Sequence, residues 1–243
     1  MRNQVKAALL KLQKSRFFYI ASLCLVLFGV FFATGTLFHD NVDDTGQDVF
    51  FLLISDVTLM FVSVAFVSYF ISSDFSNRTI CNEIRVGYSK FSVVFSRVII
   101  ALLFAIFMQL LFFGIVILMY GLVNGFGFYI PLHKLALKLI LFICQTTAVL
   151  SLAVLITFLS KKTSLSMMLS ISFVFVFFNL LRNSPISNTA FYRLTIFYRF
   201  MMNNQHMSSW DISVSFISAI ITILGALFTA YIVFRKAASA PRE

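Results

Sequence analysis

Six apolar runs, each long enough to cross a lipid bilayer as a helix, limit what this chain can fold into. The hydrocarbon core of a bilayer is about 30 Å thick and needs roughly 20 consecutive apolar residues in helical form. The runs cover residues 17–38, 50–71, 93–123, 135–159, 164–181 and 212–234. Backbone polar groups in lipid must be satisfied within the spanning structure, and no strand-like alternation runs along the chain. We therefore predict an all-α polytopic membrane protein with six transmembrane helices.

The composition agrees with a chain that lies mostly in lipid. Hydrophobic residues make up 60 % of it and charged residues only 12 %, against about 25 % in ordinary soluble domains. The first apolar run exceeds the roughly 7–15 residues of a signal-peptide core, so we interpret it as a retained span. We expect one transmembrane domain over residues 17–243, preceded by a short helix at 1–16.

The distribution of bases predicts the orientation in the membrane. Most of the 19 Lys and Arg residues lie in 1–16, 73–97, 161–162 and 235–242, which would share one side. Bases favour cytoplasmic loops, so both termini are predicted to be cytoplasmic. The net charge of +10 then reflects topology and attraction to anionic membrane lipid. Because the bases are spread over separate segments without a motif, we expect no nucleic-acid partner.

Several kinds of catalytic site are not indicated by the sequence. The three Cys and three His residues are scattered, so neither a disulfide nor a metal site is predicted. An intramembrane protease needs paired acids or similar chemistry at membrane depth, and Glu83 and Glu243 are the only glutamates. None of the nine glycines precedes Lys, so the phosphate-binding loop of an ATPase is missing. We predict a chain without enzymatic activity, whose ATP-driven work would require another chain.

The N-terminus, "MRNQVKAALLKLQKSR", has the pattern of an amphipathic helix. Val5, Ala8, Leu9 and Leu12 recur at helical spacing, and bases occupy much of the remaining surface. Such a helix is suited to the membrane interface. The alternative is a charged flank that only fixes topology.

The longest polar stretch, "SDFSNRTICNEIRVGYSK", separates the second and third apolar runs. Ile80 and Ile84 would share one face of a short helix, with Asp74 or Ser76 as its N-cap. Gly87 suits the left-handed position after the last turn. A simple connection between antiparallel helices needs about 2–8 residues. We interpret the longer stretch as a docking surface, and the alternative is a solvated loop.

Within this stretch, an acid and Phe are followed by Asn, Thr, an amphipathic segment with Glu, then Gly and Ser-Lys. The residues in this order are Asp74, Phe75, Asn77, Thr79, Ile80, Asn82, Glu83, Gly87, Ser89 and Lys90. The order resembles the segment between spans two and three of bacterial ABC transporter permeases of the type-2 exporter class. Arg78 stands where that family usually has Gly. Chain length, six spans and a basic N-terminal helix also suit the family.

The resemblance implies a partner and a mechanism. In that family the segment is a coupling helix that seats on a separate cytoplasmic ABC ATPase, which binds ATP and Mg. The residues it assigns to coupling are Asp74, Asn77, Arg78, Thr79, Asn82, Glu83, Arg85 and Gly87. Glu83, Arg85 and Arg78 would be contact residues. A second permease subunit, identical or related, would complete an exporter in a bacterial cell membrane that works by alternating access.

A few polar residues inside the apolar runs are candidates for the translocation path. They are Asp56, Gln109, Gln145 and Asn179. Intramembrane acids are rare and often functional. The alternative for the amides is hydrogen bonding between helices, and for Asp56 it is an ion pair with a base of the outer loops.

The last outer loop, residues 182–210, contains the aromatic segment "AFYRLTIFYRFMM". Ser184-Pro185 ends the preceding helix, because a residue before proline disfavours the helical conformation. Related exporters carry short interfacial helices here, which makes Phe191 and Tyr198 candidates for an outer lid. The alternative is an aromatic belt at the membrane surface.

Taken together, these features favour the permease subunit of an ATP-driven exporter. The aromatic, Met-rich spans favour a hydrophobic or amphipathic cargo, for which we expect a peptide or peptide antibiotic. Dimerisation is expected because six spans with few polar groups enclose no path alone. The alternative is an ion-coupled transporter or channel that works without ATP.

Overall fold

The computed structural model describes residues 2–14, 16–39, 45–55, 57–77, 79–127, 131–180, 195–201 and 208–239. Its elements are α1 (Arg2–Lys14), α2 (Arg16–His39), α3 (Gly46–Ser55), α4 (Thr58–Ser76), α5 (Thr79–Arg85), α6 (Lys90–Asn124), α7 (Leu132–Ser160), α8 (Thr163–Phe175), the π-helical η1 (Val176–Leu180), α10 (Ile196–Met201) and α11 (Ser209–Ser239). Regular structure in this part of the chain is entirely helical. The predicted all-α class is confirmed.

Several of these helices are long and apolar enough to cross a membrane. In the described ranges, α4, α6, α7 and α11 each meet this requirement. The end of α1 and the start of α2 form a fifth candidate if they are taken together, although they are bent by 65°. Residues 163–178 form a shorter apolar helix. A polytopic membrane protein is confirmed, and the count of six spans stays a prediction.

The second predicted span, 50–71, differs from the structure. It consists of two helices, α3 and α4, and α4 continues to Ser76. The apolar run underestimated the length of α4 because its last residues, "SSDFS", are mostly polar. A run of apolar residues marks only the part of a helix that lies in lipid. The backbone hydrogen bonds of the helix can continue past the end of that run. Asp56, between the two helices in sequence, lies outside the described residues.

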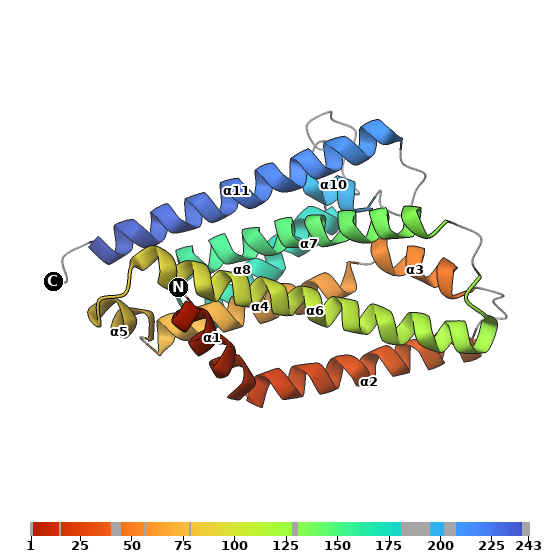
Figure 1. The fold of residues 1–243 in the computed structure, drawn as a ribbon, viewed down its shortest axis with the longest axis horizontal. Coiled ribbons are helices and arrows are strands. Elements are labelled where there is room, and N and C mark those ends of the chain that lie inside the picture. Colours follow the sequence, from red (N-terminus) through yellow and green to blue (C-terminus); the bar gives the residue numbers. More distant parts are fainter. Residues whose placement is uncertain are drawn as a thin grey trace.

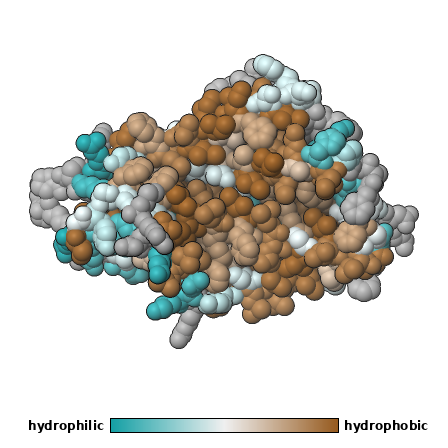
Figure 2. All heavy atoms as spheres, viewed as in Figure 1, coloured by the Kyte–Doolittle hydropathy of each residue, from teal (hydrophilic) through white to brown (hydrophobic). Residues whose placement is uncertain are grey.

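The long helices lie side by side, and the polar elements gather at one end (Figure 1). α7 packs against α11, α4 and α8, while α6 packs against α2, α3 and α4. The elements α1 and α5, the first turn of α6 and the last turns of α11 share one end of the bundle. Figure 2 shows hydrophobic residues across the middle and hydrophilic ones gathered toward the ends. This distribution is the one expected of a bundle surrounded by lipid.

Aromatic rings fill much of the interior. The Phe158 ring lies 5.2 Å from the Phe75 ring and 5.9 Å from the Phe234 ring, which joins α7 to α4 and α11. At the other end, Phe197 of α10 lies 4.8 Å from Phe177 and 5.0 Å from Phe178 of η1. Such ring pairs add about 0.5–1.5 kcal/mol each beyond the burial of their area. α10 is therefore anchored in the bundle by its aromatic side chains.

We expect Phe197→Ala to lower the thermal unfolding midpoint of the purified protein clearly. Phe197 is 4 % exposed, and truncating a buried Phe costs about 3–5 kcal/mol. Trp210→Ala is the matched control, because Trp210 is 75 % exposed and should leave the midpoint almost unchanged. Equal shifts for the two variants would contradict the anchoring of α10.

Candidate functional site: an ion-pair network beneath the polar loop

The polar loop between α4 and α6 contains the short helix α5, which presents two different faces. Ile80 is 2 % exposed and Ile84 packs partly buried against the core. Asn82 and Arg85 are exposed. The predicted short helix and its apolar inner face are confirmed. The solvated-loop alternative does not fit, because α5 rests on the bundle.

Both ends of the connection from α5 to α6 are capped, and the cap at Gly87 is the predicted one. The Gly87 N–H donates to the Ile84 carbonyl, and the Tyr88 N–H donates to the Glu83 carbonyl. This is the hydrogen-bond pattern of a Schellman motif, and Gly87 has the required positive φ of 99°. The side chain of Ser89 accepts a hydrogen bond of 3.3 Å from the Ser92 N–H at the start of α6. These caps fix the direction in which α5 leaves the bundle.

The predicted N-cap of α5 is wrong. Asp74 and Ser76 both belong to the last turns of α4, and α5 begins at Thr79. The capping rule identifies short polar residues near a helix start, but Asp74 has a stronger electrostatic partner elsewhere. Its carboxylate is turned into the bundle.

Asp74 is completely buried and is paired with two cations from other elements. Its Oδ1 is ion-paired with Lys11 Nζ of α1. Its Oδ2 lies 3.0 Å from Arg97 Nε of α6. The side chains of Asp74 and Arg97 are 0 % and 3 % exposed. This carboxylate therefore joins the ends of α1, α4 and α6.

Arg97 extends the network to α5. Its Nη2 is ion-paired with Glu83 Oε1, and the Glu83 side chain is 20 % exposed. Lys11, Asp74, Arg97 and Glu83 thus form a chain of alternating charges that is neutral overall. Removing one partner of a buried pair leaves an uncompensated charge, which costs about 3–5 kcal/mol. The network therefore favours a single arrangement of the four elements that contribute to it.

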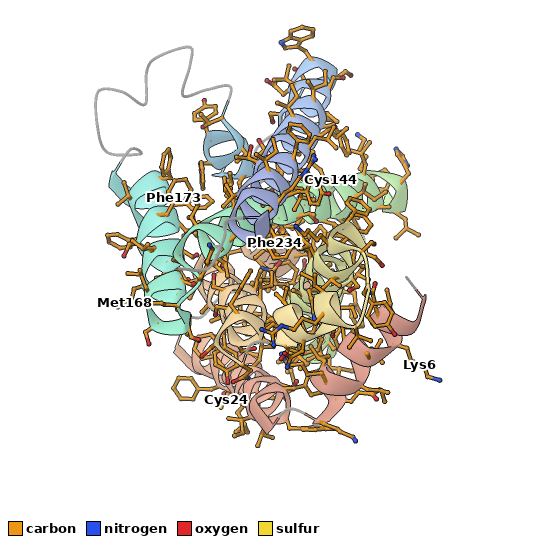
Figure 3. The ribbon with its side chains drawn as sticks, turned by 90° about the vertical axis from the view of Figure 1, so that its left-hand side faces the viewer. Lys6, Cys24, Cys144, Met168, Phe173 and Phe234 are labelled. Atoms are coloured by element: carbon orange, nitrogen blue, oxygen red, sulfur yellow. The ribbon has the colours of Figure 1, made fainter. Side chains whose placement is uncertain are left out.

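Further contacts hold α1 against the bundle. Lys11 Nζ also donates to Ser73 Oγ at 3.3 Å and lies 5.3 Å from the centre of the Phe70 ring. At the other end of α1, Ser92 Oγ of α6 is hydrogen-bonded to Gln4 Oε1. Figure 3 looks onto this end of the molecule, where Lys6 points away from the bundle and Phe234 lies at its centre. α1 is thus fastened by polar contacts as well as apolar ones.

The amphipathic pattern of α1 is confirmed in part. Ala8 and Leu12 are buried, at 0 % and 6 % exposed, but Leu9 is 44 % exposed. Lys11, assigned to the polar face, turns inward to Asp74. The buried face is therefore rotated from the predicted one, because the pairing of Lys11 with a buried acid outweighs the burial of one Leu.

The remaining residues assigned to coupling lie around this network. Asn77 follows α4 and is exposed, and Thr79 is half-buried at the start of α5. Arg78 lies outside the described residues. Because Asp74 is fully buried, its contribution here is internal rather than a surface contact. The roles of the others toward a partner stay predictions.

Two of the candidate path residues lie inside the bundle. Gln109 Nε2 donates to Ser63 Oγ at 2.8 Å, which joins α6 to α4, and Gln109 is 2 % exposed. Gln145 of α7 is completely buried. Asn179 falls within η1, but its side chain lies outside the described residues. For Gln109, the alternative of an interhelical hydrogen bond is thus observed, and a role in translocation stays a prediction.

The structure describes only one of the two residues predicted to form an outer lid. Tyr198 lies in α10 and is half-buried, whereas Phe191 lies outside the described residues. Phe200 of the same helix is completely buried, 5.8 Å from the Phe142 ring. α10 therefore packs on the bundle, and its function as a lid stays a prediction.

Comparison with known proteins provides the family. Residues 5–179 match the family model of ABC-2 family transporter proteins. This chain belongs to the ABC-2 transporter family. Comparisons with curated proteins and with solved structures found no match. The matched region covers well over half of the chain and contains all four charges of the ion-pair network.

Membership of this family makes the protein an ABC transporter permease. An ABC-2 permease is a multi-pass membrane transport subunit, not itself catalytic, and it associates with an ABC ATPase subunit. The recognition of this family from the sequence is confirmed. The polar loop at α5 lies within the matched region, together with α1 from Val5 onward and with α4 and α6.

Sequence reasoning missed the two cations of the network. The sequence assigned Lys11 to the polar face of the N-terminal helix, and Arg97 only to the bases that indicate orientation, although Arg97 lies inside the apolar run 93–123. An ionisable residue within a span usually faces the interior and pairs with another charge. That signal was available for Arg97. No such signal existed for Lys11, because Lys11 lies outside the apolar runs and its partner depends on how α1 packs on the bundle.

We expect Arg97→Gln to destabilise the permease by about 3 kcal/mol, because it leaves Glu83 unpaired and Asp74 with one cation. Arg85→Gln, at an exposed site of α5, should stay within about 0.5 kcal/mol. Adding Asp74→Asn to Arg97→Gln should cost less than the sum of the single changes. Denaturant or thermal unfolding in detergent measures all of these effects, and additive losses would contradict a coupled network.

Proposed function

We propose that this ABC-2 permease is the membrane subunit of an exporter driven by a separate ATPase that docks on α5. The observation that carries the proposal is the position of α5. It is exposed on one side and joined on the other, through one ion-pair network, to α1, α4 and α6. The ATPase subunit would supply the bound ATP and Mg.

The exposed side of α5 has the composition of a docking surface. Arg85 and Asn82 provide charge and hydrogen bonding, and both are exposed. Val86 and Tyr88 follow the helix and are 78 % and 44 % exposed. Arg and Tyr are enriched at the energetic centres of protein interfaces. A partner with an acidic, partly apolar groove would cover this surface, which we call the α5 surface (Asn82, Arg85, Val86 and Tyr88).

The ion-pair network offers a route by which a force on α5 reaches the membrane helices. Glu83 is on α5 itself, and Arg97 belongs to the first turns of α6, a helix that extends from Lys90 to Asn124. Asp74 is at the end of α4, so a displacement of Arg97 acts on both helices. In this proposal, closure of the ATPase subunits moves the ends of α1, α4, α5 and α6 as one unit. Alternating access would result from that movement.

A hydrophobic or amphipathic cargo is supported by two apolar grooves that share a wall at η1. One, of about 620 Å³, lies between α7 and α8 and includes Leu165, Leu169 and Phe173. The other, of about 480 Å³, is lined by Ile196 and Phe197 of α10 and by residues of α11 such as Ile217 and Ile221. Phe177 belongs to both grooves. Hydrophobic or amphipathic peptides match these mostly apolar walls.

The same grooves support a second permease subunit. Both are open grooves and not enclosed cavities in the described part of the chain, so a path closed on all sides requires another wall. A second copy, or a related permease, would provide it. The proposed setting is a bacterial cell membrane with both termini in the cytoplasm. The ion-coupled alternative differs in one respect that can be measured, since transport would continue without nucleotide.

The docking proposal predicts that Arg85→Glu reduces co-purification of the ATPase at least tenfold, because it reverses charge at the centre of the α5 surface. The tagged chain is purified in a mild detergent, and bound partners and ATP hydrolysis are measured. Lys162→Glu is the control, since Lys162 is an exposed base outside α5. An unchanged yield of ATPase with Arg85→Glu would remove α5 as its docking site.

The orientation is tested separately by cysteine labelling in intact cells, in a chain whose native cysteines are replaced. A membrane-impermeant maleimide should label a cysteine that replaces His133, at the exposed start of α7. It should reach a cysteine that replaces Lys162 only after the membrane is opened. The reverse pattern would place the α5 end outside and overturn the proposed coupling to a cytoplasmic ATPase.

A further inference from the structure

Three buried polar side chains from three different helices lie at one level near the middle of the bundle. They are Ser63 of α4, Gln109 of α6 and Thr146 of α7, which are 5 %, 2 % and 0 % exposed. α4, α6 and α7 pack against one another (Figure 1). Gln109 is about three helical turns further along α6 than Arg97. This polar level is therefore separate from the ion-pair network at the end of the bundle.

Contacts between the helices determine which of these side chains lie opposite each other. Gln109 Nε2 donates to Ser63 Oγ at 2.8 Å, which aligns α6 with α4. One turn beyond Gln109, on the same face of α6, is Phe113, whose ring lies 5.0 Å from the Phe142 ring of α7. Thr146 follows Phe142 by one turn on the same face of α7. Because α6 and α7 are antiparallel, Gln109 and Thr146 lie opposite each other at the same level.

Within the described residues, Gln109 and Thr146 each hold one buried polar atom without a hydrogen-bond partner. These atoms are Gln109 Oε1 and Thr146 Oγ1. The next hydroxyl of α7 differs, because Thr147 Oγ1 donates to the Ile143 carbonyl at 2.7 Å. If the Gln109 amide is turned over, its oxygen and nitrogen change places, but one of them still has no partner. An amide and a hydroxyl that could bond to each other are thus present on facing helices without being joined.

A polar group that is buried without a partner destabilises the state that contains it. Within the bilayer core, bulk water cannot supply the missing hydrogen bond. Such groups in a native structure call for an explanation, one of which is energy stored for another state. A small displacement of α7 along α6 would let the Thr146 hydroxyl donate to Gln109 Oε1. Both groups would then be satisfied.

We propose that Gln109 and Thr146 form a hydrogen bond in the second conformation of the transport cycle and position α7 against α6 in that state. This inference rests on the proposed function, because closure of the ATPase subunits would supply the displacement. Gln109 would keep its bond to Ser63, so that α4 and α6 move as a pair relative to α7. A contact made in only one of two states shifts the equilibrium toward that state. The two side chains are positioning residues that act on the helices rather than on the cargo.

The first test compares Thr146→Val with Thr147→Val in the purified permease. Valine replaces the hydroxyl by a methyl group, so Thr146→Val removes a group that is unsatisfied in the present state. It should raise the thermal unfolding midpoint by about 2–4 °C. Thr147→Val is the matched control, because it removes a hydroxyl that is already bonded, and it should not raise the midpoint. A midpoint lowered by Thr146→Val would overturn the proposal, because the hydroxyl would then already be bonded, directly or through a buried water.

The second test measures disulfide formation between Gln109→Cys and Thr146→Cys, in a chain whose native cysteines are replaced and which is purified with its ATPase. A membrane-permeant oxidant should join the two cysteines at least fivefold faster with trapped ATP than without nucleotide. Gln109→Cys combined with Thr147→Cys is the control and should show no such dependence. Equal rates with and without ATP, in a complex that hydrolyses ATP, would overturn the pairing and leave docking on α5 intact.

The third measurement is ATP hydrolysis by the same complex. Thr146→Val should lower it at least threefold, because the second conformation loses its hydrogen bond, and Thr147→Val should leave it nearly unchanged. Equal hydrolysis by the two variants would contradict a role in the cycle. A preparation without an ATPase would contradict the proposed function instead. The unfolding midpoints of the two valine variants would still decide whether the Thr146 hydroxyl is unbonded in the present state.

Discussion

The structure depends on one buried carboxylate. Asp74 has no exposure to solvent, and an unpaired charge there would cost on the order of several kcal/mol. Its two oxygens are therefore matched by two cations, Lys11 and Arg97, which come from opposite sides in the sequence. Meeting that requirement places α1 and α6 against the end of α4. Arg97 then has a second charge partner, Glu83, and this contact determines where α5 rests.

In this arrangement, internal ion pairing and exposure to a partner fall on different residues, whereas the sequence alone assigned both acids to partner contact. Asp74 and Glu83 were both assigned to the surface that meets a partner. Asp74 is instead completely buried, and Glu83 is directed to Arg97. The exposed positions after and along α5, such as Arg85 and Val86, remain for external contact. An ABC-2 permease built in this way joins the exposed residues of α5 to its membrane helices through a network whose central pair, Asp74 and Arg97, is buried.

The sequence was most informative where local physics decides the outcome. Apolar run length predicted the long helices α6, α7 and α11, and Gly87 correctly predicted the C-terminal cap of α5. The sequence-based prediction was wrong at Asp74, where a long-range ion pair takes precedence over the local capping rule. It was also wrong at Leu9 and Lys11, because the face of α1 that packs on the bundle is rotated from the predicted one. Pairings between residues more than sixty positions apart, such as Lys11 with Asp74, leave no local pattern.

The interruption between α3 and α4 illustrates the same limit. The polar residues Ser55 and Asp56 lie inside an apolar run, and hydropathy averages over them. Ser and Asp compete with the helical backbone for hydrogen bonds, which favours helix ends at such positions. If Ser55 and Asp56 are interpreted as helix-end signals, the second predicted span divides into two helices, as the structure has it.

In the proposed mechanism, α1 and α5 move together when the ATPase acts. The most direct measurement is pulsed electron resonance between spin labels on cysteines that replace Lys14 and Asn82, both exposed, in the purified permease with its co-purified ATPase. The account predicts that this distance stays the same with and without trapped ATP, while the distance from Asn82 to a label at Lys162 changes. A change of similar size in both distances would contradict it.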